Sequence, residues 1–206
     1  SGGNEDVLRL LQDINFVDVS SNAARGVYRR LEERPSPHNL VSDTKSLRAV
    51  GADRSQGGTP PILFERNDGG NQTQVSGISV KGADLDYGST LVQYRWDQNR
   101  LGWLRSQNGS PHSDVDGLQI APEVVVIQIV SYTRSAADGR SPEAVLVGTG
   151  RALLLFDGRL IEGTWERSGA FDVTRYFDRD GNAVIFPRGT TWIALPRVGQ
   201  TRIIEN

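Results

Sequence analysis

The chain contains only two histidines, and each follows a Ser-Pro pair, in Ser36-Pro37-His38 and Ser110-Pro111-His112. Histidine changes its charge near neutral pH, so it can act as a general base or bind a ligand. Proline fixes its own φ angle and holds the preceding residue extended, so both histidines follow stiff segments. A stiff loop holds a functional side chain in place. The alternative is that each histidine only ties its own loop through a hydrogen bond.

The neighbours of the two histidines extend these candidate sites. Asp114 follows His112 by two residues, and we expect it, or a nearby backbone group, to orient the imidazole. An arginine-rich stretch precedes His38 and could hold a phosphate or carboxylate, although Glu32 and Glu33 could neutralise it. The catalytic candidates are His38, His112 and Asp114, and the binding candidates are Arg29, Arg30, Arg34, Asn39 and Asp116.

The stretch from His112 to Glu123 resembles a calcium loop, because Asp114, Asp116 and Glu123 stand at ligand positions of that motif. Histidine at the first position is a poor ligand for a hard cation, and Pro122 stiffens the end of the loop. We therefore predict a turn rather than a metal site. No metal and no cofactor is expected anywhere in the chain.

Other motifs are weaker. No serine stands in a Gly-x-Ser-x-Gly elbow, so a hydrolytic triad is not indicated. The glycines of Gly148–Arg151 predict a bulge or a close backbone approach. Aromatic residues are expected mainly in the core, but Tyr94, Trp96 and Trp103 could instead form an exposed platform for a sugar.

Composition excludes several functions. The absence of cysteine rules out thiol catalysis, thiolate metal sites and disulfides. A net charge of −2 without a basic block argues against nucleic-acid binding. The apolar runs are too short for a transmembrane helix, which needs about 20 residues. Because methionine is absent, we expect a fragment or a processed chain.

The expected fold is α+β and mostly β, in two parts: residues 1–60, the C-terminal part of an α/β domain, and residues 61–206, an antiparallel β-rich domain. In the first part we predict a helix over residues 4–14, a strand at Phe16–Val19, an irregular proline-containing segment, and a short helix capped by Ser42 or Asp43.

The second part is expected to form a sandwich or a partly open barrel. Asp157-Gly158 should form a two-residue hairpin turn, and residues 124–130 a central strand buried on both faces. The predicted strands are Ile62–Glu65, Val75–Lys81, Thr90–Asp97, Gly102–Gln107, Val124–Tyr132, Ala144–Phe156, Leu160–Glu166, Asp172–Tyr176, Ala183–Phe186, Thr191–Leu195 and Thr201–Ile204.

Five stretches, in order along the chain, resemble the YerB-type bacterial lipoproteins, a family of largely unknown function: RPSPHNL, YRWDQNRLGWLRSQNGSPHSDVDG, EVVVIQIVSY, GTGRALLLFDGRLIEGTWER and GTTWIALP. The resemblance implies an extracytoplasmic lipoprotein held to the membrane only through a lipid anchor that this chain lacks. It includes Pro37–Asn39 and Pro111–Asp114 in the family pattern, without an assigned role. If the two Pro-His segments meet between the domains, they could line one pocket.

The resemblance leaves two functions open. The first is a non-catalytic envelope protein that binds a cell-wall or glycan component or a partner protein. The second is a hydrolase or transferase acting on an envelope polymer or its phosphate-linked precursor. In the second, Asp114 would orient His112 as the base, and Arg29, Arg30 or Arg34 would hold an anion.

Overall fold

The computed structural model describes residues 17–54, 77–135, 139–170 and 172–206. The chain divides into two units, Ser1–Pro60 with Arg134–Ser141, and Pro61–Thr133 with Pro142–Asn206. The predicted helix over residues 4–14 and the strand at Ile62–Glu65 lie outside the described residues. None of the described helices is long and apolar enough to cross a membrane.

In the first unit, the helix α2 (Thr44–Arg54) begins where the sequence predicts. Asp43 caps it: its Oδ1 accepts the Ser46 backbone N–H at 2.8 Å, which satisfies a donor that the first turn leaves free. The segment expected to be irregular instead contains a 3₁₀ turn η1 (Arg25–Val27) and a hairpin of β1 (Arg29–Arg30) and β2 (Leu40–Val41). The hairpin forms because both prolines lie in its loop, where no ladder hydrogen bond is lost.

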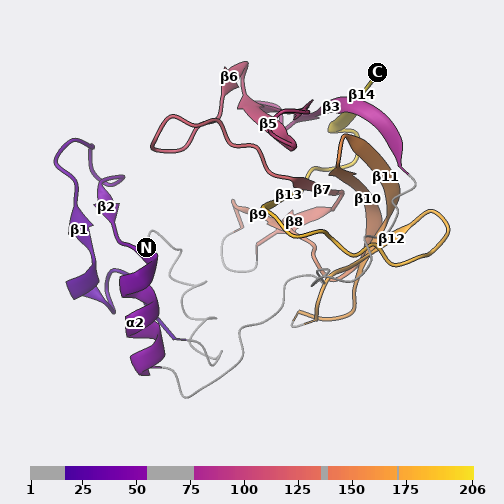
Figure 1. Ribbon diagram of the computed structural model, residues 1–206. Coiled ribbons are helices and arrows are strands. Elements are labelled where there is room, and N and C mark those ends of the chain that lie inside the picture. The colour runs from indigo at the N-terminus through magenta and orange to yellow at the C-terminus, as the bar shows by residue number, and fades with distance from the viewer. Residues whose placement is uncertain (1–16, 55–76, 136–138, 171) are drawn as a thin grey trace. The chain divides into compact units, whose positions relative to one another are not determined.

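The second unit is built on one ten-stranded sheet, which confirms a mostly β fold (Figure 1). Eight strands follow the order β13-β7-β10-β11-β3-β4-β5-β6, while β12 pairs with β11 and β14 with β3. A two-stranded sheet of β8 and β9 is separate. The strands are β3 (Ile78–Asp86), β4 (Leu91–Asp97), β5 (Gly102–Gln107), β6 (Ser110–Pro111), β7 (Val124–Gln128), β8 (Tyr132–Arg134), β9 (Pro142–Ala144), β10 (Gly148–Phe156), β11 (Arg159–Arg167), β12 (Arg175–Asp178), β13 (Thr191–Ala194) and β14 (Thr201–Glu205).

The predicted central strand is confirmed: all five residues of β7 are buried, between β13 and β10. Its alternate side chains enter two hydrophobic clusters. Val125 and Ile127 face a cluster to which β3, β4, β5 and β10 also contribute, and Val124 and Val126 face one that holds Tyr176 and Phe186. Burial on both faces explains why the sequence here is an apolar run rather than an alternation. The expectation of an entirely antiparallel domain is wrong, because β13 pairs with β7 in parallel.

The Asp157-Gly158 hairpin is also confirmed. Phe156 pairs with Arg159, and the two loop residues have φ angles of 48° and 68°, as a type I′ turn requires. The single strand predicted over Ala144–Phe156 is broken, because residues 145–147 separate β9 from β10, which begins at Gly148 with φ 122°. Gly150 is a close approach, as predicted: a Cβ there would stand 2.4 Å from Nε1 of Trp165.

The sheet is curled into a half-barrel (Figure 1). Its two ends, β13 and β6, meet partly through side chains. The guanidinium of Arg105 on β5 lies 4.7 Å from the ring centre of Trp192 on β13, and the ring of His112, which follows β6, contacts the same tryptophan edge-on at 5.9 Å. Backbone bonds from Trp103 and Arg105 to Pro122 and Ile120 extend this closure. We call Arg105, His112 and Trp192 the seam cluster.

Candidate functional site

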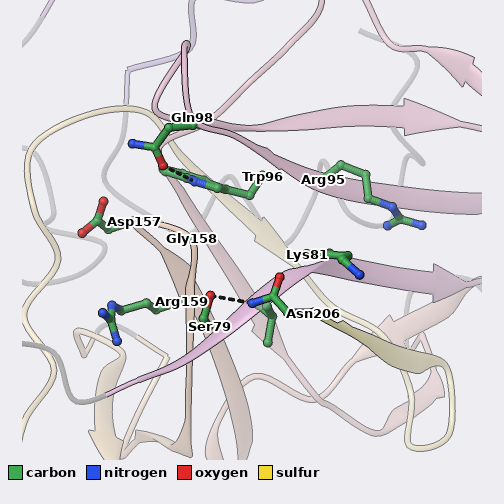
Figure 2. A pocket seen from close by; sticks show the side chains of 10 residues that line it. Ser79, Lys81, Arg95, Trp96, Gln98, Asp157, Gly158, Arg159 and Asn206 are labelled. Carbon is green, nitrogen blue, oxygen red and sulfur yellow. Dashed lines mark hydrogen bonds between the residues drawn. The ribbon is translucent and has the colours of Figure 1, made fainter.

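A groove of about 520 Å³ opens beside the Asp157-Gly158 turn (Figure 2). Four segments that are distant in sequence form it: the start of β3, the end of β4 with the residues after it, the turn between β10 and β11, and Asn206 after β14. The described residues that line it are Ser79, Val80, Lys81, Arg95, Trp96, Gln98, Asp157, Gly158, Arg159 and Asn206.

Trp96 is the aromatic wall of the groove. The ring is only partly buried and rests against Trp103 at a centroid distance of 5.1 Å and a tilt of 55°. Its Nε1 donates to Oε1 of Gln98 at 3.2 Å, which fixes the ring orientation (Figure 2). A Cβ at Gly158 would lie 2.9 Å from this Nε1. Glycine at this position therefore serves both the turn and the space in front of the indole.

The three aromatic residues considered as a sugar-binding platform, Tyr94, Trp96 and Trp103, do not form one exposed surface. Tyr94 and Trp103 are fully buried in the first hydrophobic cluster, whereas Trp96 reaches the groove. All three point to the same side of the β4–β5 pair, as the spacing predicts. Their exposure differs because Trp96 stands at the end of its strand, where the interior opens.

Three cations and one carboxylate line the groove. Arg95 is tied to Asp84 at 2.6 Å, and Arg159 donates to the Gly77 carbonyl at 3.0 Å. Lys81, one of only two lysines in the chain, is exposed and has no ion-pair partner among the described residues. The only lining carboxylate, among the described residues, is Asp157. The groove therefore favours a ligand with negative charge.

Asp84 anchors the cationic side of the groove. Its carboxylate is buried and accepts from Arg95 and from Arg202, the latter at 2.7 Å. Burial pushes the pKa of Asp84 upward, but the hydrogen bonds from Arg202 and Arg95 outweigh it and hold this pKa below its usual value. The carboxylate is therefore ionised at neutral pH and fixes the position of Arg95.

The remaining lining groups are polar donors and acceptors. The Asn206 amide donates to the Ser79 hydroxyl at 2.6 Å, and Figure 2 shows this pair across the groove from Trp96 and Gln98. Amides, guanidinium groups and a carboxylate around one exposed indole can bind the hydroxyls of a sugar whose C–H face packs on the ring.

In the structure, His112 does not pair with Asp114. The imidazole Nδ1 instead takes a hydrogen bond from Nη1 of Arg105, because a guanidinium can only donate. Asp114 Oδ1 accepts the backbone N–H groups of Asp116 and Leu118, and so closes its own turn. Of the two expected partners of the imidazole, Asp114 is therefore wrong, because the backbone N–H groups of its own turn occupy the carboxylate.

The carboxylates of the calcium-like stretch, His112 to Glu123, also make separate contacts and do not share one partner. Asp116 is exposed, and the Glu123 carboxylate accepts the Thr190 backbone N–H at 2.7 Å. Among the described residues, no three or more histidine, aspartate or glutamate side chains gather as metal ligands would.

The first unit holds the other candidates. His38 is exposed, and its backbone N–H bonds to the Pro35 carbonyl at 3.0 Å. Asn39 accepts from Arg30 at 2.6 Å and donates to the Leu31 carbonyl. Arg29 and Arg34 are exposed. Asn39 therefore holds Arg30 and the hairpin loop together. His38 and His112 belong to different units, so a pocket shared by both stays a prediction.

Sequence reasoning missed Lys81, Arg159 and Arg105. No motif marks them, because the groove and the seam cluster are made by pairing between strands that are distant in sequence. One signal was present: Arg105 interrupts the apolar side of β5, two residues after the buried Trp103.

Comparison with known proteins gives two findings. Residues 83–193, more than half of the chain, match the C-terminal domain of a protein family of unknown function, DUF3048. The crystal structure of the YerB protein from Bacillus subtilis has the same fold, with a TM-score of 0.71 and 22% sequence identity, over 100% of this chain and 68% of YerB. A search of curated proteins gives no match.

Both findings confirm the resemblance inferred from the sequence motifs. The matched range runs from β3 to β13 and includes Arg95, Trp96 and the Asp157-Gly158 turn of the groove. It also includes the whole seam cluster. The chain belongs to the YerB-like DUF3048 family, a family of unknown function.

Proposed function

We propose that the β unit binds a carbohydrate polymer of the bacterial cell envelope in the groove beside Trp96. The observation that carries the proposal is an indole left partly open in a groove lined by hydrogen-bonding side chains. An aromatic surface in a concave site with several polar groups is the arrangement that a bound sugar ring uses. The net positive lining favours a polymer that bears phosphate or carboxylate groups.

Binding explains the site better than catalysis does. Glycoside hydrolysis ordinarily uses two carboxylates across the scissile bond, and the described lining residues include only Asp157. His112 is also unsuited to act as a base. Its Nδ1 already accepts from Arg105, and the other nitrogen of a neutral ring carries the proton. A hydrolase or transferase acting on the polymer is therefore the weaker of the two functions.

We place this activity outside the cytoplasmic membrane, in a lipoprotein anchored to that membrane. The support is the YerB-like family membership together with the kind of ligand that the groove favours. Fractionation of cells that express the natural protein tests this placement. Recovery in the cytoplasm rather than with the membrane would contradict it.

Retention on purified wall polysaccharide tests the binding proposal, with ¹H–¹⁵N spectra of the Trp96 indole as the site-specific readout. Trp96→Leu removes the aromatic face and keeps apolar contact with Trp103, so affinity should fall about tenfold or more. Equal binding by wild type and Trp96→Leu, or polymer binding that leaves the indole signal unchanged, would contradict the groove as the site.

The two lysines provide a matched charge control. Lys81→Ala should weaken retention of an anionic polymer and reduce its dependence on salt. Lys45→Ala removes the same charge from an exposed position on helix α2 and should leave retention unchanged. If both variants bind alike, the effect comes from net charge and the groove does not select the polymer.

A further inference from the structure

The seam cluster contains a buried cation that lacks a carboxylate partner among the described residues. Arg105 is only 7% exposed. Its Nη1 donates to His112 and, at 3.4 Å, to Gln107, and its guanidinium lies over the Trp192 ring. Each of these contacts is uncharged when His112 is neutral. Arginine is always protonated, so this charge stays in the interior.

Two buried polar groups at this position lack a hydrogen bond of normal geometry, the Arg105 Nε–H and the Tyr94 hydroxyl. The Arg105 side chain nevertheless lies near enough to the phenol to oppose the rise that burial causes in the Tyr94 pKa. The two residues are directly opposite on β4 and β5, so their side chains share one face of the sheet. An unsatisfied buried donor carries a free-energy cost, so a ligand that accepts from it is stabilised there.

The chemistry of this pair selects an acceptor that carries negative charge. A guanidinium edge matches the two oxygens of a carboxylate or phosphate, and a phenol hydroxyl can donate to either. Burial raises the pKa of Tyr94 to about 12 against the opposing effect of the nearby Arg105 side chain, so the phenol keeps its proton at neutral pH. Around the guanidinium, Tyr94 thus supplies a second donor and no competing charge.

His112 contacts both Arg105 and Trp192 through its side chain, at the side of the seam cluster that is next to exposed residues. Its backbone is fixed, because its N–H bonds to the Arg105 carbonyl at 3.0 Å and its carbonyl accepts from Ile120 at 2.8 Å. The imidazole is half-buried, and the next residues, Ser113–Leu118, are exposed. Rotation of this one side chain would uncover the guanidinium without breaking the backbone pairing.

We propose that Arg105 and Tyr94 form an oxyanion-binding site in the seam between β5 and β13, with the His112 side chain as its entrance. The ligand group is a carboxylate or a phosphate. This site is separate from the groove, and the proposal does not depend on carbohydrate binding there.

Titration of the full chain with inorganic phosphate and, separately, acetate tests the proposal, with chloride at matched ionic strength as the reference. Binding should raise the melting temperature with increasing oxyanion concentration and shift the Arg105 Nε–H signal in ¹H–¹⁵N spectra. The phosphate and acetate arms show which oxyanion fits better. If chloride changes the melting temperature and the Arg105 Nε–H signal as much as phosphate and acetate do, the site does not recognise oxyanions and the proposal is overturned.

Three variants localise the effect. Tyr94→Phe removes only the hydroxyl and should weaken binding about tenfold. Arg105→Lys keeps the charge but loses the two-pronged geometry and should weaken binding further. His112→Ala should retain binding, since it frees the entrance. Trp96→Leu in the groove should also leave it unchanged.

No response of the Arg105 Nε–H signal to either oxyanion, in wild type and in His112→Ala, would overturn the proposal. So would equal affinity in wild type and Tyr94→Phe, because the phenol would then take no part. Tyr94→Phe changes no side-chain volume beyond one oxygen, so it keeps the test valid even if Arg105→Lys fails to fold.

Discussion

The groove and the seam cluster each place an arginine near a tryptophan, but they handle the positive charge differently. In the groove, the Arg95 side chain is 37% exposed and is paired with Asp84. In the seam, Arg105 is almost fully buried and contacts a histidine, an amide and an indole. Removing an exposed charged side chain costs little stability, because water solvates the groups that it leaves behind. Removing a buried one costs more, because its neighbours lose their packing and hydrogen-bond contacts.

The comparison predicts that removing an exposed polar side chain of the groove changes binding, and that removing the buried Arg105 of the seam changes stability. A polar groove exposed to water loses little when one side chain is removed, because water replaces its hydrogen bonds. In the seam, water does not reach the buried Arg105 and cannot replace its hydrogen bonds. The predictions below run from the largest expected effect on stability to the smallest.

Arg105→Ala should lower the free energy of unfolding by about 3 kcal/mol, since it removes packing on Trp192 and the donor to His112 inside the protein. Urea unfolding measures the loss. Arg159→Ala, at an exposed position in the groove, should cost no more than about 1 kcal/mol and is the matched control. Equal losses in the two variants would contradict the distinction between groove and seam.

Gly158→Val should cost about 2–3 kcal/mol, because valine is strained at φ 68° and its Cβ would crowd the Trp96 ring. Gly88→Val is the control: its φ of 86° is also positive, but a Cβ there meets nothing within 4 Å. The difference between the two melting temperatures isolates the contact with Trp96. If they match, backbone strain alone explains the effect.

Asp84 should make stability depend on pH below its ordinary pKa of about 3.9. Its folded-state pKa is lowered, so its contribution is present above the unfolded pKa and disappears as pH falls through the folded value. Asp84→Asn should cost about 1–3 kcal/mol at neutral pH and flatten the stability profile below about pH 4. An unchanged acid profile in the variant would show that other carboxylates dominate it.

The two Pro-His segments give the smallest predicted effects. His112→Ala should cost about 1 kcal/mol, because it removes the acceptor for Arg105 and an edge contact with Trp192. His38→Ala should change stability by no more than about 0.5 kcal/mol, because its ring is exposed. Thermal unfolding of both variants measures this, and a larger loss for His38→Ala would reverse the assignment.

Local features of the fold were readable from single stretches. Asp157-Gly158 predicted its turn because positive φ angles restrict which residues can stand there. The run from Val124 predicted a doubly buried strand, since only burial on both faces tolerates continuous apolar residues. Asp43 was one of two predicted caps for helix α2, and its carboxylate reaches the first-turn N–H groups within the same segment. The family was also recognisable, because its motifs occur in order along the chain.

The candidate site was much less predictable. Asp114 was expected to orient His112 from its closeness in sequence, but the partner is Arg105 on a neighbouring strand. Trp96 could not be separated from Trp103 by pattern, because both point to the same side of the sheet and only the end of the strand opens to solvent. Lys81, Arg159 and Gln98 carry no motif at all.

By itself, the sequence determined the mostly β class, the central strand and the hairpin turn, because each depends on chain-local sterics or on burial periodicity. It also determined the family, through the order of its motifs. Only the tertiary structure decided which polar side chains meet. Strand register and sheet curl bring β3, β4 and the β10–β11 turn together at the groove, and bring β5 against β13 at the seam. Those contacts join residues far apart in the chain, and no local pattern encodes such a distance.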